Sequence, residues 1–250
     1  MYVSRAPNLT PPTAPSARSD HHESRTYSST TRLHWRASVT RVSMYFVKES
    51  AGVREEPGSA SGNRRSAQRE ATRARLFEVT VEEFKERGFA ATEISVIAER
   101  VGVSRGAFYM HFADKSEVLR ELLRIEERRI AAAVLPSSDR GVPLEEVFSG
   151  VVDAVLAAER RLGRRLVREL CAAQFRPDFG KSDDVGDHPV GLMLIDAIAD
   201  RPTQIDPADL AMTFLTGLFG LLATDEAAPA ARRRRLDLLV QLAASGTIAP

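Results

Sequence analysis

The sequence predicts an all-α fold, and three observations support this class. Apolar residues recur every three or four positions through most of the chain after residue 65, which is the spacing of one face of an α-helix. Serine, threonine and aspartate stand where these periodic segments begin, and glycine stands where several of them end, as expected at helix caps. The sequence has no alternating apolar pattern of useful length for a β-strand and no internal repeat.

The composition is that of a soluble globular protein. Of 250 residues, 43% are hydrophobic and 28% are charged, which is ordinary for this class. No apolar run approaches the roughly 18 residues of a membrane span, and the N-terminus has no apolar stretch of signal-peptide type. We therefore expect a cytoplasmic protein with no membrane partner. The formal net charge is +1, so any affinity for nucleic acid must come from the local placement of charges.

Residues 1–65 are predicted to be a disordered basic extension. This segment is rich in Pro, Ser, Thr and Arg, and its ten basic residues exceed its five acidic ones. Such a composition buries too little apolar surface to offset the entropy of the chain. We interpret the extension as a dispensable tail, with Met44 as a candidate start. The alternative is a basic arm that contacts DNA phosphates.

Residues 66–126 are expected to form one domain, which begins with two helices. The first helix has an apolar stripe and ends at Gly88, a C-terminal cap residue. The second begins at Thr92, whose hydroxyl is a candidate N-cap, and it stops at Gly102. The predicted apolar stripes are Ala67, Ala71, Ala74, Phe77, Val81 and Phe84 in the first helix, and Ile94, Ile97, Ala98 and Val101 in the second.

Two further helices complete this domain. Ser104 is the expected N-cap of a third helix that continues to Met110, and Asp114 is the expected N-cap of a fourth. The fourth helix has Val118, Leu122 and Ile125 on its predicted inner face. The tight spacing of the second and third helices predicts a helix-turn-helix at about 93–112. In that motif the second helix of the pair enters a DNA major groove.

The residue types of the third helix suit DNA. Ser104 and Arg105 stand at its start, where backbone N–H groups and the helix dipole attract phosphate, and a guanidinium matches the O6 and N7 atoms of guanine. Gly106 and Ala107 are small enough for the backbone to approach base edges. Residues 66–125 contain ten basic and ten acidic residues, so binding must depend on placement rather than on bulk positive charge.

The run GFAATEISVIAERVGVSRGAFYMHFADKSEVLRELL, Gly88 to Leu123, resembles the DNA-binding domain of the tetracycline-repressor (TetR) family of bacterial regulators. With the first helix, the resemblance covers about residues 69–128. The residues that match the family pattern are Gly88-Phe89, Thr92, Ile97-Ala98, Gly102-Val103-Ser104, Gly106, Tyr109-x-His111-Phe112 and Lys115. Two positions depart from it: Glu93 stands where the family usually has Thr or Ser, and Val96 where it often has an acid.

The resemblance implies a role for individual residues. The positions that match phosphate contacts in the family are Thr92, Tyr109, His111 and Lys115. The positions that match its base-contacting segment are Ser104, Arg105, Gly106 and Ala107. Phe108 and Phe112 are interpreted as apolar residues that hold the unit together. Glu93 is expected to favour the start of the second helix rather than to contact phosphate.

Residues 127–250 are also predicted to be helical. The resemblance implies that this part binds a small-molecule effector and forms a homodimer, with the last two helices of each subunit in a four-helix bundle. Apolar faces at 210–222 and 236–242, with Gly217 and Gly220 for close helix approach, agree with a dimer; the alternative is that these faces close the core of the monomer. A two-fold dimer implies a near-palindromic operator in double-stranded DNA. The arginine run 232–235 is interpreted as a solvated face.

An effector pocket is expected among the middle helices. The candidate lining residues are Phe148, Val152, Leu166, Cys171, Phe175 and Met193. Cys171, the single cysteine, is interpreted as a buried thiol rather than a redox sensor. The acidic residues and histidine between 183 and 188 are interpreted as a solvated loop rather than a metal site.

No nucleophile–base set and no phosphate-binding loop occurs in the sequence, so we expect neither an enzyme nor a cofactor. The leading hypothesis is a homodimeric repressor that a small-molecule ligand releases from its operator. Two alternatives remain: a regulator or activator that has no small-molecule effector, and a helical interaction protein that does not bind DNA.

Overall fold

The computed structural model describes residues 60–137, 141–176 and 188–245, and every element of regular structure in these ranges is helical. The predicted all-α class is confirmed. The helices are α2 (Ala60–Arg87), α3 (Ile94–Val101), α4 (Arg105–Tyr109), α5 (Lys115–Val134), the 3₁₀ turn η1 (Leu135–Ser137), α6 (Leu144–Leu162), α7 (Arg164–Ala173), α8 (Pro189–Ala199), α9 (Pro207–Thr224) and α10 (Pro229–Ser245).

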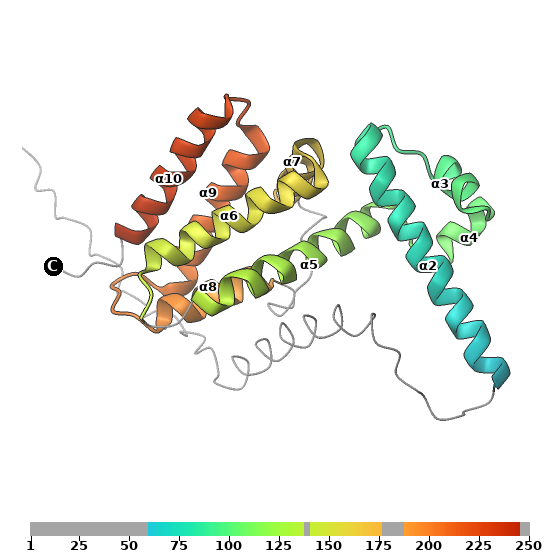
Figure 1. Cartoon of the computed structure of the whole chain (residues 1–250), viewed down its shortest axis with the longest axis horizontal. Helices are drawn as coiled ribbons and strands as arrows, with labels where there is room; N and C mark the ends of the chain where they lie inside the picture. Colours follow the sequence, from blue (N-terminus) through green and yellow to red (C-terminus); the bar gives the residue numbers. More distant parts are fainter. Residues whose placement is uncertain (1–59, 138–140, 177–187, 246–250) are drawn as a thin grey trace, which may run out of the picture.

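Figure 1 shows two helical bodies joined by α5. Helices α2, α3 and α4 form the N-terminal body, and α6 to α10 form the C-terminal bundle, against which the second half of α5 packs. The expected disorder of 1–59 and the expected polar loop at 177–187 lie outside the described residues. Residues 60–65 belong to α2, so the expected extension ends earlier than predicted.

Most helix ends follow the local signals of the sequence. Ser104 caps α4 by accepting the Ala107 N–H at 3.1 Å, and Asp114 caps α5 by accepting the Glu117 N–H at 2.8 Å. Gly102 ends α3 with φ of 78°, a left-handed conformation that favours glycine. Asp206 caps α9 through the N–H groups of the second and third residues after it.

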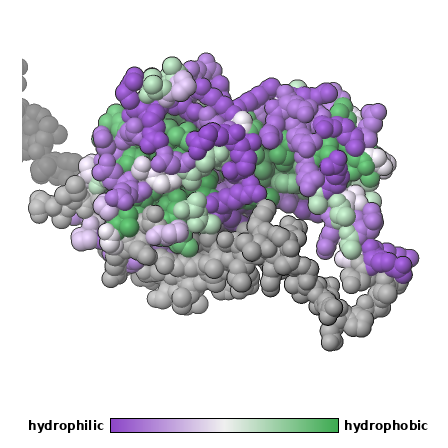
Figure 2. Space-filling model, in the orientation of Figure 1, coloured by the Kyte–Doolittle hydropathy of each residue, from purple (hydrophilic) through white to green (hydrophobic). Residues whose placement is uncertain are grey.

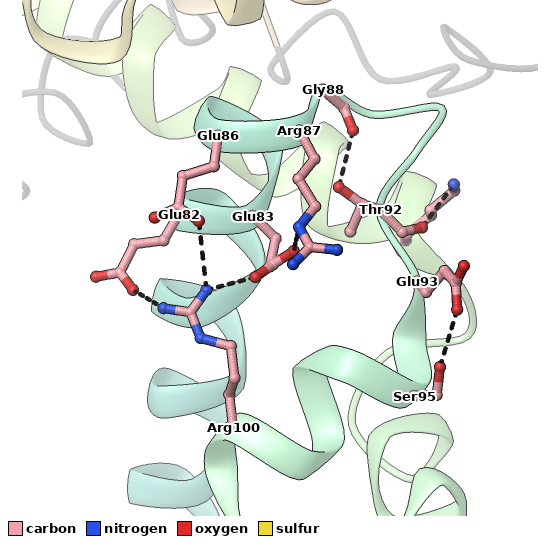
Figure 3. Close-up of polar contacts among 10 residues, drawn as sticks. Glu82, Glu83, Glu86, Arg87, Gly88, Thr92, Glu93, Ser95 and Arg100 are labelled. Atoms are coloured by element: carbon pink, nitrogen blue, oxygen red, sulfur yellow. Dashed lines mark hydrogen bonds and ion pairs between the residues drawn. The ribbon is translucent and has the colours of Figure 1, made fainter.

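The predicted N-cap of α3 is wrong. Glu93 occupies that position, and its side chain makes no capping hydrogen bond. The Thr92 hydroxyl instead donates to the carbonyl of Gly88 at 2.8 Å, and Thr92 is buried. The threonine therefore closes the α2–α3 turn rather than beginning the next helix (Figure 3).

The apolar stripe predicted for the first half of α2 is also wrong. Ala67, Ala71 and Ala74 are exposed, whereas Leu76, Val79 and Phe84 are at most 1% exposed. The buried apolar side chains of the helix thus lie in its C-terminal half. Alanine fits either a buried or an exposed helix face, so its spacing alone does not identify the core side.

The C-terminal bundle has a continuous apolar core. The rings of Phe148 in α6 and Phe214 in α9 lie 4.5 Å apart at their centroids, and both are fully buried. Helix α9 packs against α7, α8 and α10. Among the helices of the described ranges, α9 is long and apolar enough to cross a membrane by length and composition. Its packing against three neighbouring helices makes it a core helix of the bundle.

The interpretation of the arginine run as a solvated face is wrong for Arg232, whereas the other three arginines of the run are exposed, as predicted. Arg232 is 6% exposed and donates two hydrogen bonds to Glu159 of α6, at 2.7 and 2.6 Å. Arg233 contacts Asp153 of α6 at 2.6 Å, and Arg235 contacts Asp225 at 2.6 Å. The run therefore attaches α10 to its neighbours through ion pairs.

Candidate nucleic-acid interface

Helix α3 is fixed on α2 by an ion-pair cluster (Figure 3). The Arg100 guanidinium of α3 contacts Glu83, whose side chain is 2% exposed, and it lies 3.1 Å from a carboxylate oxygen of Glu82. Arg87 contacts the same Glu83 at 3.1 Å. A buried carboxylate is costly unless it is paired, so Glu83 holds both arginines and thereby orients α3.

Two phenylalanines attach α4 to the domain. Phe108 and Phe112 are at most 1% exposed, and their ring centroids are 5.7 Å apart. Burial of this side leaves Ser104, Arg105 and Gly106 exposed on the opposite side. The structure thus has a short helix whose polar and small residues face solvent, as the sequence predicts for a major-groove helix.

Arg105 and Tyr109 form a pair along the exposed side of α4. The guanidinium donates to the tyrosine hydroxyl at 3.3 Å and lies 5.8 Å from its ring centroid. This hydrogen bond raises the pKa of Arg105 above its ordinary value. The tyrosine ring stands edge-on to the buried Phe108, so a half-exposed ring orients the cation at the surface.

His111 lies beside two cations of α2. Burial first, and then the charges of Arg69 and Arg73, lower its pKa below the ordinary value. This places the first part of α2 next to the end of α4.

The polar groups of Thr92 and Lys115, both expected to contact phosphate, are directed into the protein. The Lys115 ammonium donates to the carbonyls of Phe89, Ala90 and Thr92 at 2.8, 3.2 and 3.0 Å. Thr92 is buried and bonded to Gly88. These two side chains stabilise the α2–α3 turn, and a phosphate contact would require them to release their present partners.

Glu93 occupies the N-cap position of α3 without a capping hydrogen bond, and the expectation that it does not contact phosphate stays a prediction. It is exposed, and its carboxylate accepts from the Ser95 hydroxyl at 3.3 Å (Figure 3). It lines an open groove of about 500 Å³ that also contains Arg105 and Tyr109.

The sequence interpretation missed one exposed residue of this surface. Met110 follows α4 and is 71% exposed, more than any other large apolar side chain of the described chain. An exposed apolar residue beside a helix that enters a DNA groove would suit contact with a thymine methyl group. In the sequence, the position of Met110 between Tyr109 and His111, two candidate phosphate contacts, was the signal that could have placed it on this surface.

The C-terminal bundle encloses a small apolar cavity of about 40 Å³. Of the six predicted lining residues, Cys171 alone lines it. Four of the others are buried in the core with 0–1% exposure: Phe148, Val152, Leu166 and Met193. The sixth, Phe175, is 52% exposed. The observed lining comes from α5 to α9: Leu123, Glu126, Glu127, Ile130, Val151, Val155, Ala158, Leu162, Val167, Leu170, Cys171, Val190, Leu215 and Phe219.

Cys171 is a buried thiol, as predicted. Burial raises its pKa to about 12, so it stays protonated and unreactive at neutral pH. The two glutamates of the lining were not predicted. Glu126 contacts Arg129 and Arg161, and Glu127 contacts His188 at 3.7 Å.

Helix α7 joins the cavity to the N-terminal domain. Val167 and Cys171 line the cavity, and the Glu169 carboxylate, on another side of the helix, accepts the backbone N–H of Phe89 at 2.8 Å. Arg165 lies so close to Gly88 that an added Cβ would stand 2.3 Å from its guanidinium. One helix therefore contacts both the cavity and the turn that precedes α3.

Comparison with known proteins identifies the N-terminal domain. Residues 76–122 match the family described as bacterial regulatory proteins, tetR family. The chain is 33% identical over 104 residues to the HTH-type transcriptional regulator AcrR of Shigella flexneri, covering 40% of this chain and 47% of that protein. It is 44% identical over 52 residues to the HTH-type transcriptional repressor KstR2 of Mycobacterium tuberculosis, covering 21% and 26%.

These alignments span about half, or less, of the curated relatives' length. Among solved structures, the chain resembles FadR of Thermus thermophilus, a TetR-family transcriptional repressor in complex with lauroyl-CoA, with a TM-score of 0.56 and 19% identity. That match covers 71% of this chain and 96% of the other. It extends the shared fold into the C-terminal bundle.

Proposed function

We propose that this chain, whose residues 76–122 match the tetR family of bacterial regulatory proteins, is a sequence-specific DNA-binding transcriptional regulator in the cytoplasm. The observation that carries the proposal is the exposed side of α4. There a charged Arg105 is oriented by Tyr109 beside a glycine. Arg105 contacts a base, and Tyr109 and His111 contact phosphates of double-stranded DNA.

The finer proposal is a homodimeric repressor that leaves its operator when a small molecule binds in the C-terminal bundle. AcrR and KstR2 are named as a regulator and a repressor, and the FadR structure contains an acyl-CoA. The apolar lining of the cavity suits a ligand with an apolar body. A ligand that displaces α7 would also displace Glu169 from the Phe89 N–H, and so shift the turn before α3.

A second candidate is a regulator without a small-molecule effector, and the size of the cavity favours it. A volume of about 40 Å³ is far below the roughly 300–1,000 Å³ of small-molecule pockets. Release by a ligand therefore requires the helices around the cavity to separate. Titration of a protein–DNA complex with candidate ligands distinguishes the two, because a releasing ligand must bind the DNA-free state more tightly.

Selection from a random duplex library tests the function itself. The full chain is expected to enrich a near-palindromic sequence, because a two-fold dimer places two copies of α4 on successive major grooves. A gel shift then compares the enriched duplex with a scrambled duplex of equal composition. Equal affinity for the two duplexes, or no enrichment, would leave the helical interaction protein as the better hypothesis.

Replacing Arg105 by alanine is expected to weaken operator binding by about 1–3 kcal/mol per protomer and to relax base preference at one position of each half-site. The matched control is Arg75→Ala, which removes one exposed charge of the same domain whose contact is with Glu78, within α2 itself. Binding is measured by fluorescence anisotropy on the selected duplex and on single-base variants of it. Unchanged discrimination in the Arg105 variant would show that this side chain does not contact a base.

A further inference from the structure

The charges of α2 are divided between its two halves. Residues 64–75 contain five arginines and one acidic residue, whereas 76–87 contain four glutamates against two basic residues. The acidic half packs on the domain, and residues 64–70 are all exposed. Figure 1 shows that the first turns of α2 project past α4, and Figure 2 shows strongly hydrophilic residues at that projecting end.

Three of these arginines stand four residues apart: Arg65, Arg69 and Arg73. We refer to them as the arginine row, because residues at this spacing share one side of a helix. Arg73 lies 4.5 Å from the ring centroid of Phe112 and donates to Glu121 of α5 at 2.9 Å. Arg69 and Arg73 both act electrostatically on His111. The row therefore continues the surface that ends at His111, just after α4.

The two outer members of the row have no acidic partner among the residues that the structure describes. In the ranges that the structure describes, neither Arg65 nor Arg69 takes part in an ion pair, unlike Arg73. Positive charges near a helix N-terminus oppose the helix dipole, and the first turn of α2 has no acid to offset them. An anion on this side of α2 would pair with the two arginines and would offset their unfavourable interaction with the helix dipole.

We propose that Arg65 and Arg69 bind the phosphate backbone of the duplex that flanks the segment contacted by α4. From Arg73 to Arg65 the helix rises about 12 Å, which corresponds to roughly three to four base pairs of duplex at 3.4 Å each. This contact rests on the proposed function. It adds a sequence-independent phosphate contact beside the helix that contacts the bases.

The salt dependence of DNA binding tests the proposal. The double variant Arg65→Ala/Arg69→Ala of the full chain is compared with the wild type on the selected operator with flanking duplex, between about 50 and 200 mM KCl. Each lost phosphate contact reduces the slope of log K against log salt by about 0.9. We therefore expect the slope to fall by about 2 for each bound protomer. The matched control, Arg75→Ala/Lys85→Ala, removes two charges from the same helix outside the row and should keep the wild-type slope.

The length of the duplex supplies a second measurement. Trimming the duplex to the segment contacted by α4 should abolish the difference between the wild type and the double variant. If the double variant keeps the slope of the control on the long duplex, the arginine row does not contact DNA, although operator binding stands. If the wild-type chain shows no salt-dependent binding to any duplex, both this proposal and the proposed function are wrong.

Discussion

Replacing Arg232 by alanine is expected to lower the free energy of unfolding by about 3–5 kcal/mol, the range for breaking a buried ion pair from one side. The arginine side chain is 7% exposed and that of Glu159 is 15% exposed. Two hydrogen bonds join them. The alanine variant leaves the Glu159 carboxylate in the protein without its main cation, and it removes the more buried of the ion pairs that Arg232 and Arg233 make between α10 and α6.

Arg234 provides the control for this experiment. It belongs to the same run but is exposed, so Arg234→Ala should change stability by less than about 0.5 kcal/mol. Urea unfolding, followed by circular dichroism at one fixed protein concentration, measures both variants. The double variant Arg232→Met/Glu159→Leu should recover most of the loss, because apolar residues of similar volume replace such pairs at little cost. Equal stability of the two alanine variants would contradict the structural role of the pair.

The outcome for Arg232 illustrates which features of this protein the sequence predicts. Ser104, Asp114 and Gly102 act within three or four residues of themselves, so their roles in the caps and turn follow from local rules. The partner of Arg232 is 73 positions away in the sequence. A run of four arginines has the same appearance whether its members face solvent or neutralise acids on another helix.

The candidate DNA-binding surface was predictable for a similar reason. The small, charged and aromatic residues of α4 lie within one short segment, so their spacing alone indicates a groove-facing helix. The positions of Thr92 and Lys115 were not predictable in this way, because their polar groups bind backbone carbonyls of the α2–α3 turn. The path of that turn depends on its packing against α5 and α7, which no local pattern of residues specifies.

The cavity was the least predictable part. Phe148 has the size and apolar character of a pocket residue, but its ring fills the space next to Phe214. Core packing at interior density leaves few voids, and their positions follow from the fit of all neighbouring side chains. Glu126 and Glu127 interrupt the apolar stripe of α5, where Ile125 was expected to face inward. Two consecutive acids within a predicted inner face were the available signal for a polar site.

Replacing Leu242 by aspartate is expected to dissociate the proposed homodimer and to lower operator affinity by about 10²–10⁴-fold. Leu238 and Leu242 of α10 are 53% and 63% exposed, and Met212 of the neighbouring α9 is 57% exposed. Helices α9 and α10 already pack on each other, and Gly217 gives Leu239 room to approach. Their remaining exposed apolar side chains are suited to a second copy of the chain.

The size of the effect follows from the linkage between the two half-sites. In a dimer, binding of one α4 places the second at a high effective concentration over its own half-site, and separate protomers lose this advantage of about 10²–10⁴.

Analytical ultracentrifugation measures assembly, and fluorescence anisotropy measures operator affinity. Phe175→Asp, which places the same charge at an exposed apolar position outside α9 and α10, should leave both unchanged. A Leu242→Asp chain that remains dimeric would exclude this side of α10 from the interface. A monomeric chain with wild-type affinity would instead show that the operator needs only one copy of α4.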